Sequence, residues 1–186
     1  GFKETYSSAS ENGVMLWDNA LGYPVVSKNG EWRQVVLEDG RYAGGITTDQ
    51  TAASTNTSYA LTYTSSTADG ITNGTPASRL VFEEAGQYMV SFSAQIASTS
   101  SSTVNFWFWP RVNGVDVAGS TMKNALHQNG SVLVVSRSAI FEFTAGDYLE
   151  AMWAVDSTNG RLDANAATAF APSAPAATIA ISRFHA

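Results

Sequence analysis

The stretch that decides the fold covers residues 88–96 and reads Tyr-Met-Val-Ser-Phe-Ser-Ala-Gln-Ile. Every second side chain in it is apolar or aromatic, and the residues between them are mostly small and polar. Such an alternation predicts a β-strand with one face toward a core, because successive side chains of a strand point to opposite faces. The predicted inner face consists of Tyr88, Val90, Phe92, Ala94 and Ile96.

Further strands are expected on both sides of this segment. Val132–Phe143 is long and rich in residues that favour strands, and Tyr148–Val155 follows it after the turn dipeptide Gly146-Asp147. Residues 178–184 are predicted to form a closing strand, with Ile179 and Ile181 on one face. Weaker strand candidates are residues 35–37 and 59–63.

Turn signals separate these segments. Asn-Gly or Asp-Gly occurs eight times, and such dipeptides favour tight hairpins because both residues tolerate a positive φ. The pairs begin at Asn12, Asn29, Asp39, Asp69, Asn73, Asn113, Asn129 and Asn159. No segment has the period of an amphipathic helix, and Pro172 and Pro175 predict a loop in residues 164–177. The chain is therefore predicted to be all-β.

The composition narrows the classes of function. Charged residues make up 14% of the chain, against about 25% in typical soluble domains, and the net charge is −6. The ten Lys and Arg residues form no basic run, so no nucleic-acid partner is expected. The chain has no cysteine and no long apolar stretch, so neither a disulfide, a thiolate metal site nor membrane insertion is expected. No metal and no cofactor are predicted.

The chain is predicted to have two parts. Residues 1–40 are interpreted as an N-terminal arm or stalk-proximal segment, and residues 41–186 as one β domain. The stretch 47–67 is rich in Ser, Thr and Ala, as linkers often are. It is placed inside the domain because apolar residues alternate between positions 59 and 63.

Four segments in order resemble a known family. They are F-E-E-A-G-Q-Y-M-V-S-F-S (82–93), W-P-R-V-N-G-V-D-V (109–117), A-I-F-E-F-T-A-G-D-Y-L-E-A-M-W (139–153) and A-T-I-A-I-S-R-F (177–184). The series resembles TNF-like and C1q-like jelly rolls over about residues 45–186. The W-P-R-V-N-G and A-G-D-Y-L-E elements are similar to domains of phage tail fibres and other virion proteins.

The resemblance implies a two-sheet antiparallel jelly-roll sandwich that assembles as a homotrimer. It also implies a structural protein of a virion, located at a tail-fibre tip or in a head fibre. Its role there would be to bind a host-surface glycan or protein, or to decorate the particle. The alternative is a secreted C1q-like or lectin-like module that recognises glycan or protein. Absence of cysteine and short polar connections distinguish the chain from animal members of the family.

The sequence does not predict an enzyme, and the family supplies no catalytic residues to carry over. His127 and His185 lie in no metal-binding or catalytic frame. Glu142 and Glu150 flank the turn at Gly146-Asp147, so they could approach each other across a hairpin, as glycoside hydrolysis would need. The favoured interpretation is that both glutamates are solvated outer-face residues and that Asp147 caps backbone N–H groups in the turn.

The strongest candidate for a contact site is the strand at residues 104–112, which carries aromatic residues on both faces. Phe106 and Phe108 point one way, and Trp107 and Trp109 point the other way with Arg111 two positions further on. One face must be sandwich core, and the sequence leaves open which one. The other face is expected to pack on a neighbouring subunit, to pack on the N-terminal segment or to stack on sugar. Trp107, Trp109 and Arg111 are the predicted interface or ligand contacts.

Overall fold

The structure, a computed structural model, describes residues 15–18, 23–34 and 40–184. It divides the chain into two compact units, Gly1–Glu38 and Asp39–Ala186. The sequence analysis placed the start of the β domain two residues later than this division. The role of the first unit as an arm stays a prediction.

The N-terminal unit contains a three-stranded antiparallel sheet in the order β1-β2-β3. Its strands are β1 (Met15–Asp18), β2 (Tyr23–Lys28) and β3 (Glu31–Gln34). Asn29 and Gly30 join β2 to β3 with φ values of 53° and 81°. Two successive positive φ values are what a two-residue hairpin of type I′ requires, as the Asn-Gly pair predicted. The strand candidate at 35–37 lies outside the described residues.

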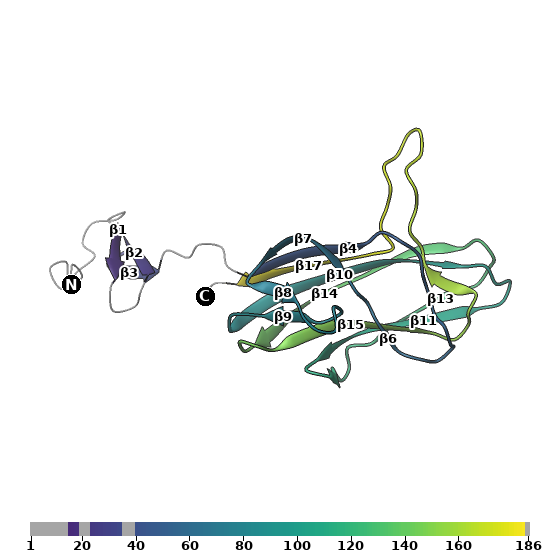
Figure 1. The fold of residues 1–186 in the computed structure, drawn as a ribbon, viewed down its shortest axis with the longest axis horizontal. Helices are drawn as coiled ribbons and strands as arrows, with labels where there is room; N and C mark the ends of the chain where they lie inside the picture. The colour runs from purple at the N-terminus through teal and green to yellow at the C-terminus, as the bar shows by residue number, and fades with distance from the viewer. Residues whose placement is uncertain (1–14, 19–22, 35–39, 185–186) are drawn as a thin grey trace. The chain divides into compact units, whose positions relative to one another are not determined.

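The larger unit is a sandwich of two antiparallel sheets (Figure 1), here named sheet I and sheet II. Sheet I consists of β4 (Arg41–Ile46), β5 (Gln50–Thr51), β7 (Thr64–Asp69), β10 (Gly86–Ser98), β14 (Val132–Phe143), β16 (Gly160–Leu162) and β17 (Ala177–Phe184). Sheet II consists of β6 (Tyr59–Ala60), β8 (Ile71–Asn73), β9 (Leu80–Phe82), β11 (Val104–Val112), β12 (Val115–Asp116), β13 (Met122–Leu126) and β15 (Tyr148–Val155). The predicted fold class, an all-β two-sheet sandwich, is confirmed.

Each sheet is built around a strand whose neighbours are distant in sequence. In sheet I, β10 pairs with β14 along one side and with β17 and then β16 along the other, and β17 pairs in turn with β4. In sheet II, β15 lies between β11 and β9. Among the described strands, the chain passes from sheet I to sheet II four times, between β5 and β6, β7 and β8, β10 and β11, and β14 and β15. These crossings generate the jelly-roll arrangement.

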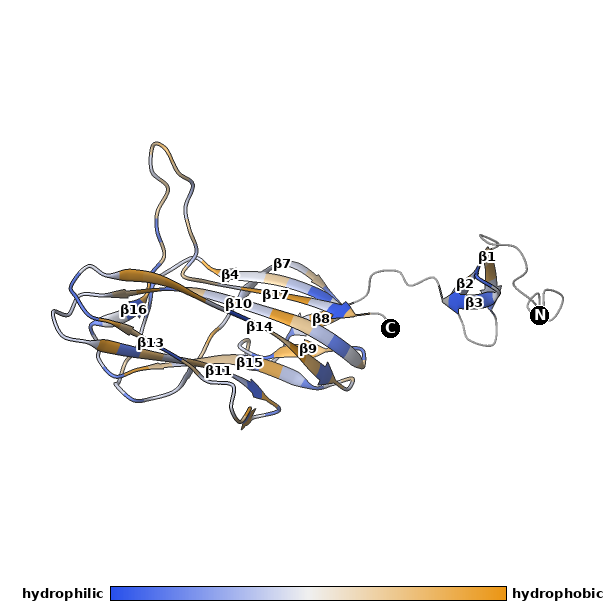
Figure 2. Ribbon diagram, turned by 180° about the vertical axis from the view of Figure 1, so that it is seen from behind, coloured by the Kyte–Doolittle hydropathy of each residue, from blue (hydrophilic) through white to orange (hydrophobic). Residues whose placement is uncertain are grey.

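The core lies between the two sheets, and apolar residues run along strands of both (Figure 2). The predicted inner face of β10 is correct: Tyr88, Val90, Ala94 and Ile96 are buried, and Phe92 is half-buried and packs against the core. Aromatic rings fill one end of the sandwich, where the Phe82 and Phe143 rings stack at 3.7 Å between centroids. The alternation in the sequence thus predicts which residues are buried.

Two predicted segments differ from the structure. The candidate strand 59–63 shrinks to β6, because only Tyr59 and Ala60 pair with β15. Leu61 still donates a backbone hydrogen bond to Ala151, and both Leu61 and Tyr63 are buried. The predicted loop at 164–177 rises from the sandwich as a hairpin between β16 and β17 (Figure 1) and reaches only to Ala176, since β17 begins at Ala177.

Candidate functional site

The predicted contact residues lie together on the outer face of sheet II. Phe106 and Phe108 on β11 point into the core and are 0% and 2% exposed. Trp107, Trp109 and Arg111 therefore point outward, and all three are half-buried. The structure thus answers the question that the sequence left open, because the phenylalanine face is the core and the tryptophan face is not.

A short hairpin holds this tryptophan face in place. The turn after β11 brings β12 back alongside it, so that Asp116 lies opposite Arg111. One oxygen of Asp116 accepts hydrogen bonds from Arg111 Nε at 2.7 Å and from Trp109 Nε1 at 2.8 Å. These two bonds, with that from Arg111 the larger cause, lower the pKa of the Asp116 carboxyl from its usual value. Trp109 is thereby held in one orientation by a charged acceptor.

Polar groups flank the two indoles on neighbouring strands. Lys123 on β13 places its Nζ 5.4 Å from the centroid of the Trp107 ring, within the range of a cation–π contact. Glu150 on β15 lies opposite Arg111, is only 7% exposed and accepts a hydrogen bond from Ser78 Oγ at 2.7 Å. The face therefore combines flat aromatic surface with fixed donors and acceptors, a combination suited to recognition.

The two glutamates considered for glycoside hydrolysis do not come together. The expectation that they approach across a hairpin is wrong, because β14 belongs to sheet I and β15 to sheet II. Glu142 is exposed on the outer face of sheet I, whereas Glu150 lies on the outer face of sheet II. The expectation that both are solvated is also wrong for Glu150, which is buried beneath Ser78.

The prediction for Asp147 is correct. Its carboxylate accepts hydrogen bonds from the backbone N–H and the hydroxyl of Thr144, at 2.7 and 2.9 Å, and from Asn113 Nδ2 at 2.7 Å. The bond from the Thr144 backbone is the largest cause of the lowered pKa of this carboxyl. Asp147 thus joins the turn between β14 and β15 to the turn between β11 and β12.

The structure describes one of the two histidines, His127. His127 is exposed, and its Nδ1 lies 3.1 Å from Thr103 Oγ1. His185 lies outside the described residues. Within residues 15–18, 23–34 and 40–184, no three His, Cys, Asp or Glu side chains are grouped as a metal site would need. The same residues include no helix with the length and apolar character of a membrane span.

A second surface, on the outer face of sheet I, was not identified from the sequence. Two cross-strand rows on this face carry only small uncharged residues. The rows are Ser138, Ser91, Ala180 and Ala43, and Ser136, Ser93, Thr178 and Gly45. On the edge strand β14 the rows are flanked by Val134 and Ile140, which are 59% and 58% exposed. We call these ten residues the sheet I face.

The two rows of the sheet I face also form the floor of a shallow groove. One wall of the groove is the base of the hairpin formed by residues 164–176, which carries no charged residue. Two backbone hydrogen bonds between Asn165 and Ala174 close this base, and a turn from Thr168 to Ala171 forms the tip. The side chain of Phe170 at the tip is 91% exposed. The hairpin thus presents an aromatic ring well away from the core.

A signal for the sheet I face was present in the sequence. Residues 132–135 are four consecutive apolar residues, so a strand through them must be apolar on both faces. The same argument that singled out residues 104–112 applies here. The signal could have identified β14 as a contact strand.

Known proteins resemble this chain in fold and not in sequence. No family model matches the chain, and no curated protein matches it. Among solved structures, the chain is similar to the crystal structure of murine APRIL, a TNF family member, with a TM-score of 0.50. The two share 7% sequence identity over 78% of this chain and 98% of that one. The fold is TNF-like.

This TNF-like domain accordingly confirms the predicted jelly roll. The likeness is one of fold, since 7% identity leaves almost every side chain different. What this particular surface binds follows only from its own residues.

Proposed function

We propose that this chain is a non-enzymatic binding domain that assembles as a homotrimer through the sheet I face and is displayed on a virion. The observation that carries the assembly is the sheet I face itself, exposed and uncharged across two rows, with Val134 and Ile140 open to solvent at its edge. Solvent-facing strand positions normally carry charged or larger polar residues. An edge strand with exposed apolar residues invites association unless another chain covers it.

The size of the face suits a stable contact between subunits. β14 and β10 pair over twelve residues, from Gly86↔Phe143 to Ala97↔Val132. The five strands β14, β10, β17, β4 and β7 have 12, 13, 8, 6 and 6 residues, so strand spacings give a face of about 700 Å². An interface of standard size buries about this area on each partner.

The arrangement of the two apolar regions favours a ring over a two-fold dimer. The bulky side chains, Val132, Val134 and Ile140, lie on the edge strand β14, whereas the rows carry only small side chains on β10, β17 and β4 in the middle of the sheet. An edge of one copy that packs on the middle of the next is a heterologous contact, and such contacts form a ring when the rotation between copies closes. A trimer is the ring size that the TNF-like fold suggests.

The assembly is tested by light scattering during size exclusion on the full chain and two variants, Val134→Lys and Ile140→Lys. Both variants should elute as monomers, because each buries a charge in the proposed contact. Val115→Lys is the matched control, since Val115 is 70% exposed on β12 of sheet II and its replacement should leave the trimer intact. A wild-type monomer at micromolar concentration would end the proposal.

The virion setting is supported by the resemblance of the W-P-R-V-N-G and A-G-D-Y-L-E segments to tail-fibre domains. It predicts virion genes beside the coding sequence and the protein itself in purified particles. The competing setting is a secreted C1q-like or lectin-like module, which would instead have an upstream collagen-like Gly-x-y repeat or secretion signal. Absence of the protein from particles would exclude the first setting.

The tryptophan face is proposed to bind the partner, a host-surface glycan or protein. Indole rings bury much area and lose little rotamer entropy, so they carry interfaces disproportionately. Trp107→Ala should weaken binding to the host surface by a hot-spot amount of about 2 kcal/mol while the protein remains trimeric. New reducing ends from a host polysaccharide incubated with the protein, lost in Glu142→Gln or Glu150→Gln, would show instead that the domain is an enzyme.

A further inference from the structure

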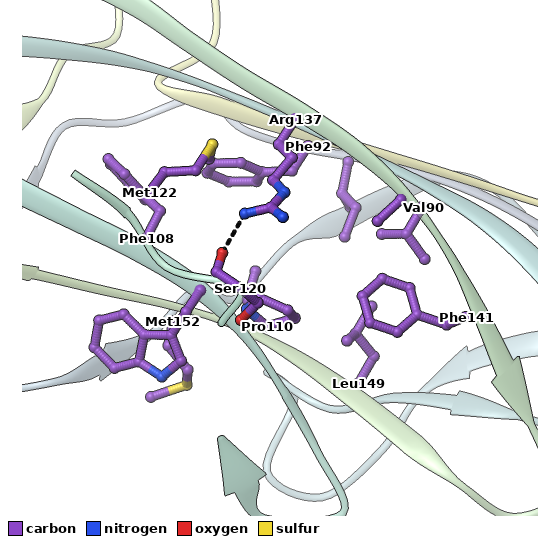
Figure 3. A pocket seen from close by; sticks show the side chains of 14 residues that line it. Val90, Phe92, Phe108, Pro110, Ser120, Met122, Arg137, Phe141, Leu149 and Met152 are labelled. Carbon is purple, nitrogen blue, oxygen red and sulfur yellow. Dashed lines mark hydrogen bonds between the residues drawn. The ribbon is translucent and has the colours of Figure 1, made fainter. Parts of the chain in front are cut away.

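An apolar cavity of about 70 Å³ lies between the two sheets, at the side where β14 faces β11 and β13 (Figure 3). It is lined by Phe92 and Phe141 from sheet I and by Phe108, Met122 and Leu149 from sheet II. The cavity is open to solvent on one side, so a ligand has a way in. The cavity does not reach the sheet I face, but Trp109 of the tryptophan face contributes to its lining.

One charged side chain, Arg137, lines this cavity. Arg137 lies on β14 directly opposite Phe92, at a position whose neighbours on the same face, Val135 and Ala139, point toward the sandwich interior. Its Nη1 donates a hydrogen bond to the backbone carbonyl of Ser120 at 2.5 Å, across the gap between the sheets (Figure 3). Although the position faces inward, the Arg137 side chain is exposed, so its guanidinium lies at the solvent-facing mouth of the cavity.

Arg137 is incompletely paired. A guanidinium has five N–H donors, and within the described part of the chain Arg137 forms one hydrogen bond and no ion pair with a carboxylate. Arg183 on β17 likewise donates to a backbone carbonyl, that of Ala85, whereas three other arginines on the two sheets have carboxylate partners. Arg111 pairs with Asp116, Arg161 with Asp163, and Arg41 with Asp69. Donors are therefore left over at the mouth of an apolar space, where a carboxylate would be the matching acceptor.

The volume limits what can enter. An apolar cavity of about 150 Å³ holds benzene, so a space of half that size takes an aliphatic end of about three carbons and no aromatic ring. We propose that the cavity binds a short-chain aliphatic carboxylic acid, of about four to six carbons, with its alkyl end among Phe92, Phe108 and Met122 and its carboxylate on Arg137. The site adds ligand binding to a domain otherwise proposed to bind only macromolecules.

The chain supplies its own reporters for this proposal. It has four methionines: Met122 and Met152 line the cavity, whereas Met15 lies in the N-terminal unit and Met89 on the outer face of sheet I. With ¹³C-methyl methionine in the full chain, hexanoate should shift the Met122 signal saturably and leave those of Met15 and Met89 in place. Shifts of Met15 and Met89 equal to that of Met122 would show unspecific binding and overturn the proposal, as would no saturable shift of Met122.

Two variants distinguish the contribution of the ligand's carboxylate to binding from that of its alkyl chain. Arg137→Gln keeps a donor for Ser120 and removes the charge, so hexanoate should bind about tenfold or more weakly while hexan-1-ol binds as in the wild type. Ala139→Val narrows the cavity and should weaken the acid and the alcohol alike. If Arg137→Gln binds hexanoate as the wild type does, Arg137 serves only to join the two sheets and the proposal fails. Light scattering on the same samples reports assembly separately, so a failure of the ligand proposal can be told apart from a failure of the proposed trimer.

Discussion

Replacement of two adjacent aromatic residues on β11 by alanine tests the assignment of the two faces most directly. The Phe108 side chain is 2% exposed, packs against Phe92 with 5.4 Å between ring centroids and lines the cavity, so Phe108→Ala removes a complete core contact. Such truncations cost about 3–5 kcal/mol in the free energy of unfolding. For a domain of this size each kcal/mol lowers Tm by about 2–4 °C, so Tm should fall by roughly 10 °C.

Trp109→Ala should cost less, although the side chain removed is larger. Trp109 is half-buried and loses one hydrogen bond, to Asp116, which is worth about 1 kcal/mol, together with part of its apolar contact. We therefore expect a loss of about 2 kcal/mol, a Tm lower by about 5 °C, and a clear loss of partner binding.

Circular dichroism melts of the two variants, run beside the wild type at equal concentration, measure this difference. Light scattering on the same samples shows whether assembly has changed, since Tm of an oligomer depends on concentration. A Trp109→Ala variant that loses as much stability as Phe108→Ala would refute the reasoning, because Trp109 would then be core. Wild-type melting and wild-type binding together would remove Trp109 from the contact site.

Three further outcomes are expected. Phe170→Ser should leave Tm unchanged in a circular dichroism melt, because the ring is 91% exposed and contributes little to the core; a lowered Tm would mean that the hairpin packs on the domain. Gly114→Ala should lower the free energy of unfolding in urea by about 1 kcal/mol, because the φ of +79° at this position strains any side chain. Gly45→Ala is the control and should leave that free energy unchanged, because Gly45 has room for a methyl group. The pKa of the Asp147 carboxyl is lowered in the folded state, so the stability it contributes is present above its ordinary pKa near 3.8 and is lost as pH falls through the folded pKa. Asp147→Asn should therefore be less stable than the wild type at pH 7 and equally stable in strong acid. A difference in stability that persists in strong acid would contradict this assignment.

Local pattern was enough to predict much of the fold. The bounds of Val132–Phe143 and Tyr148–Val155 match β14 and β15, because alternation and turn dipeptides are properties of neighbouring residues. The inward residues of β10 follow from the same period. The pairing of these strands into sheets depends on residues far apart in the chain. A single sequence carries no direct signal for that pairing.

The errors at the candidate site have that same origin. Glu142 and Glu150 flank one turn, and only the passage of the chain from one sheet to the other separates them. Trp109 and Phe108 are both large and apolar, so period two shows that they point apart but not which of them faces the core. Arg137 gave no signal at all, because its role depends on Phe108 and Met122, which join the cavity from the opposite sheet.

The position of β17 has a consequence for how the domain acquires its structure. β17 is the last strand that the structure describes, yet it lies between β10 and β4 and pairs with both. Until the ribosome has released residues 177–184, the strands on either side of that place have no common neighbour, and their exposed edges can pair with other chains. Contacts between β4 and β17 span more than a hundred residues, an arrangement that slows folding. Cells that make this protein must therefore protect a nearly complete but open sheet, and a truncation that removes even this one strand would leave the whole sandwich unable to close.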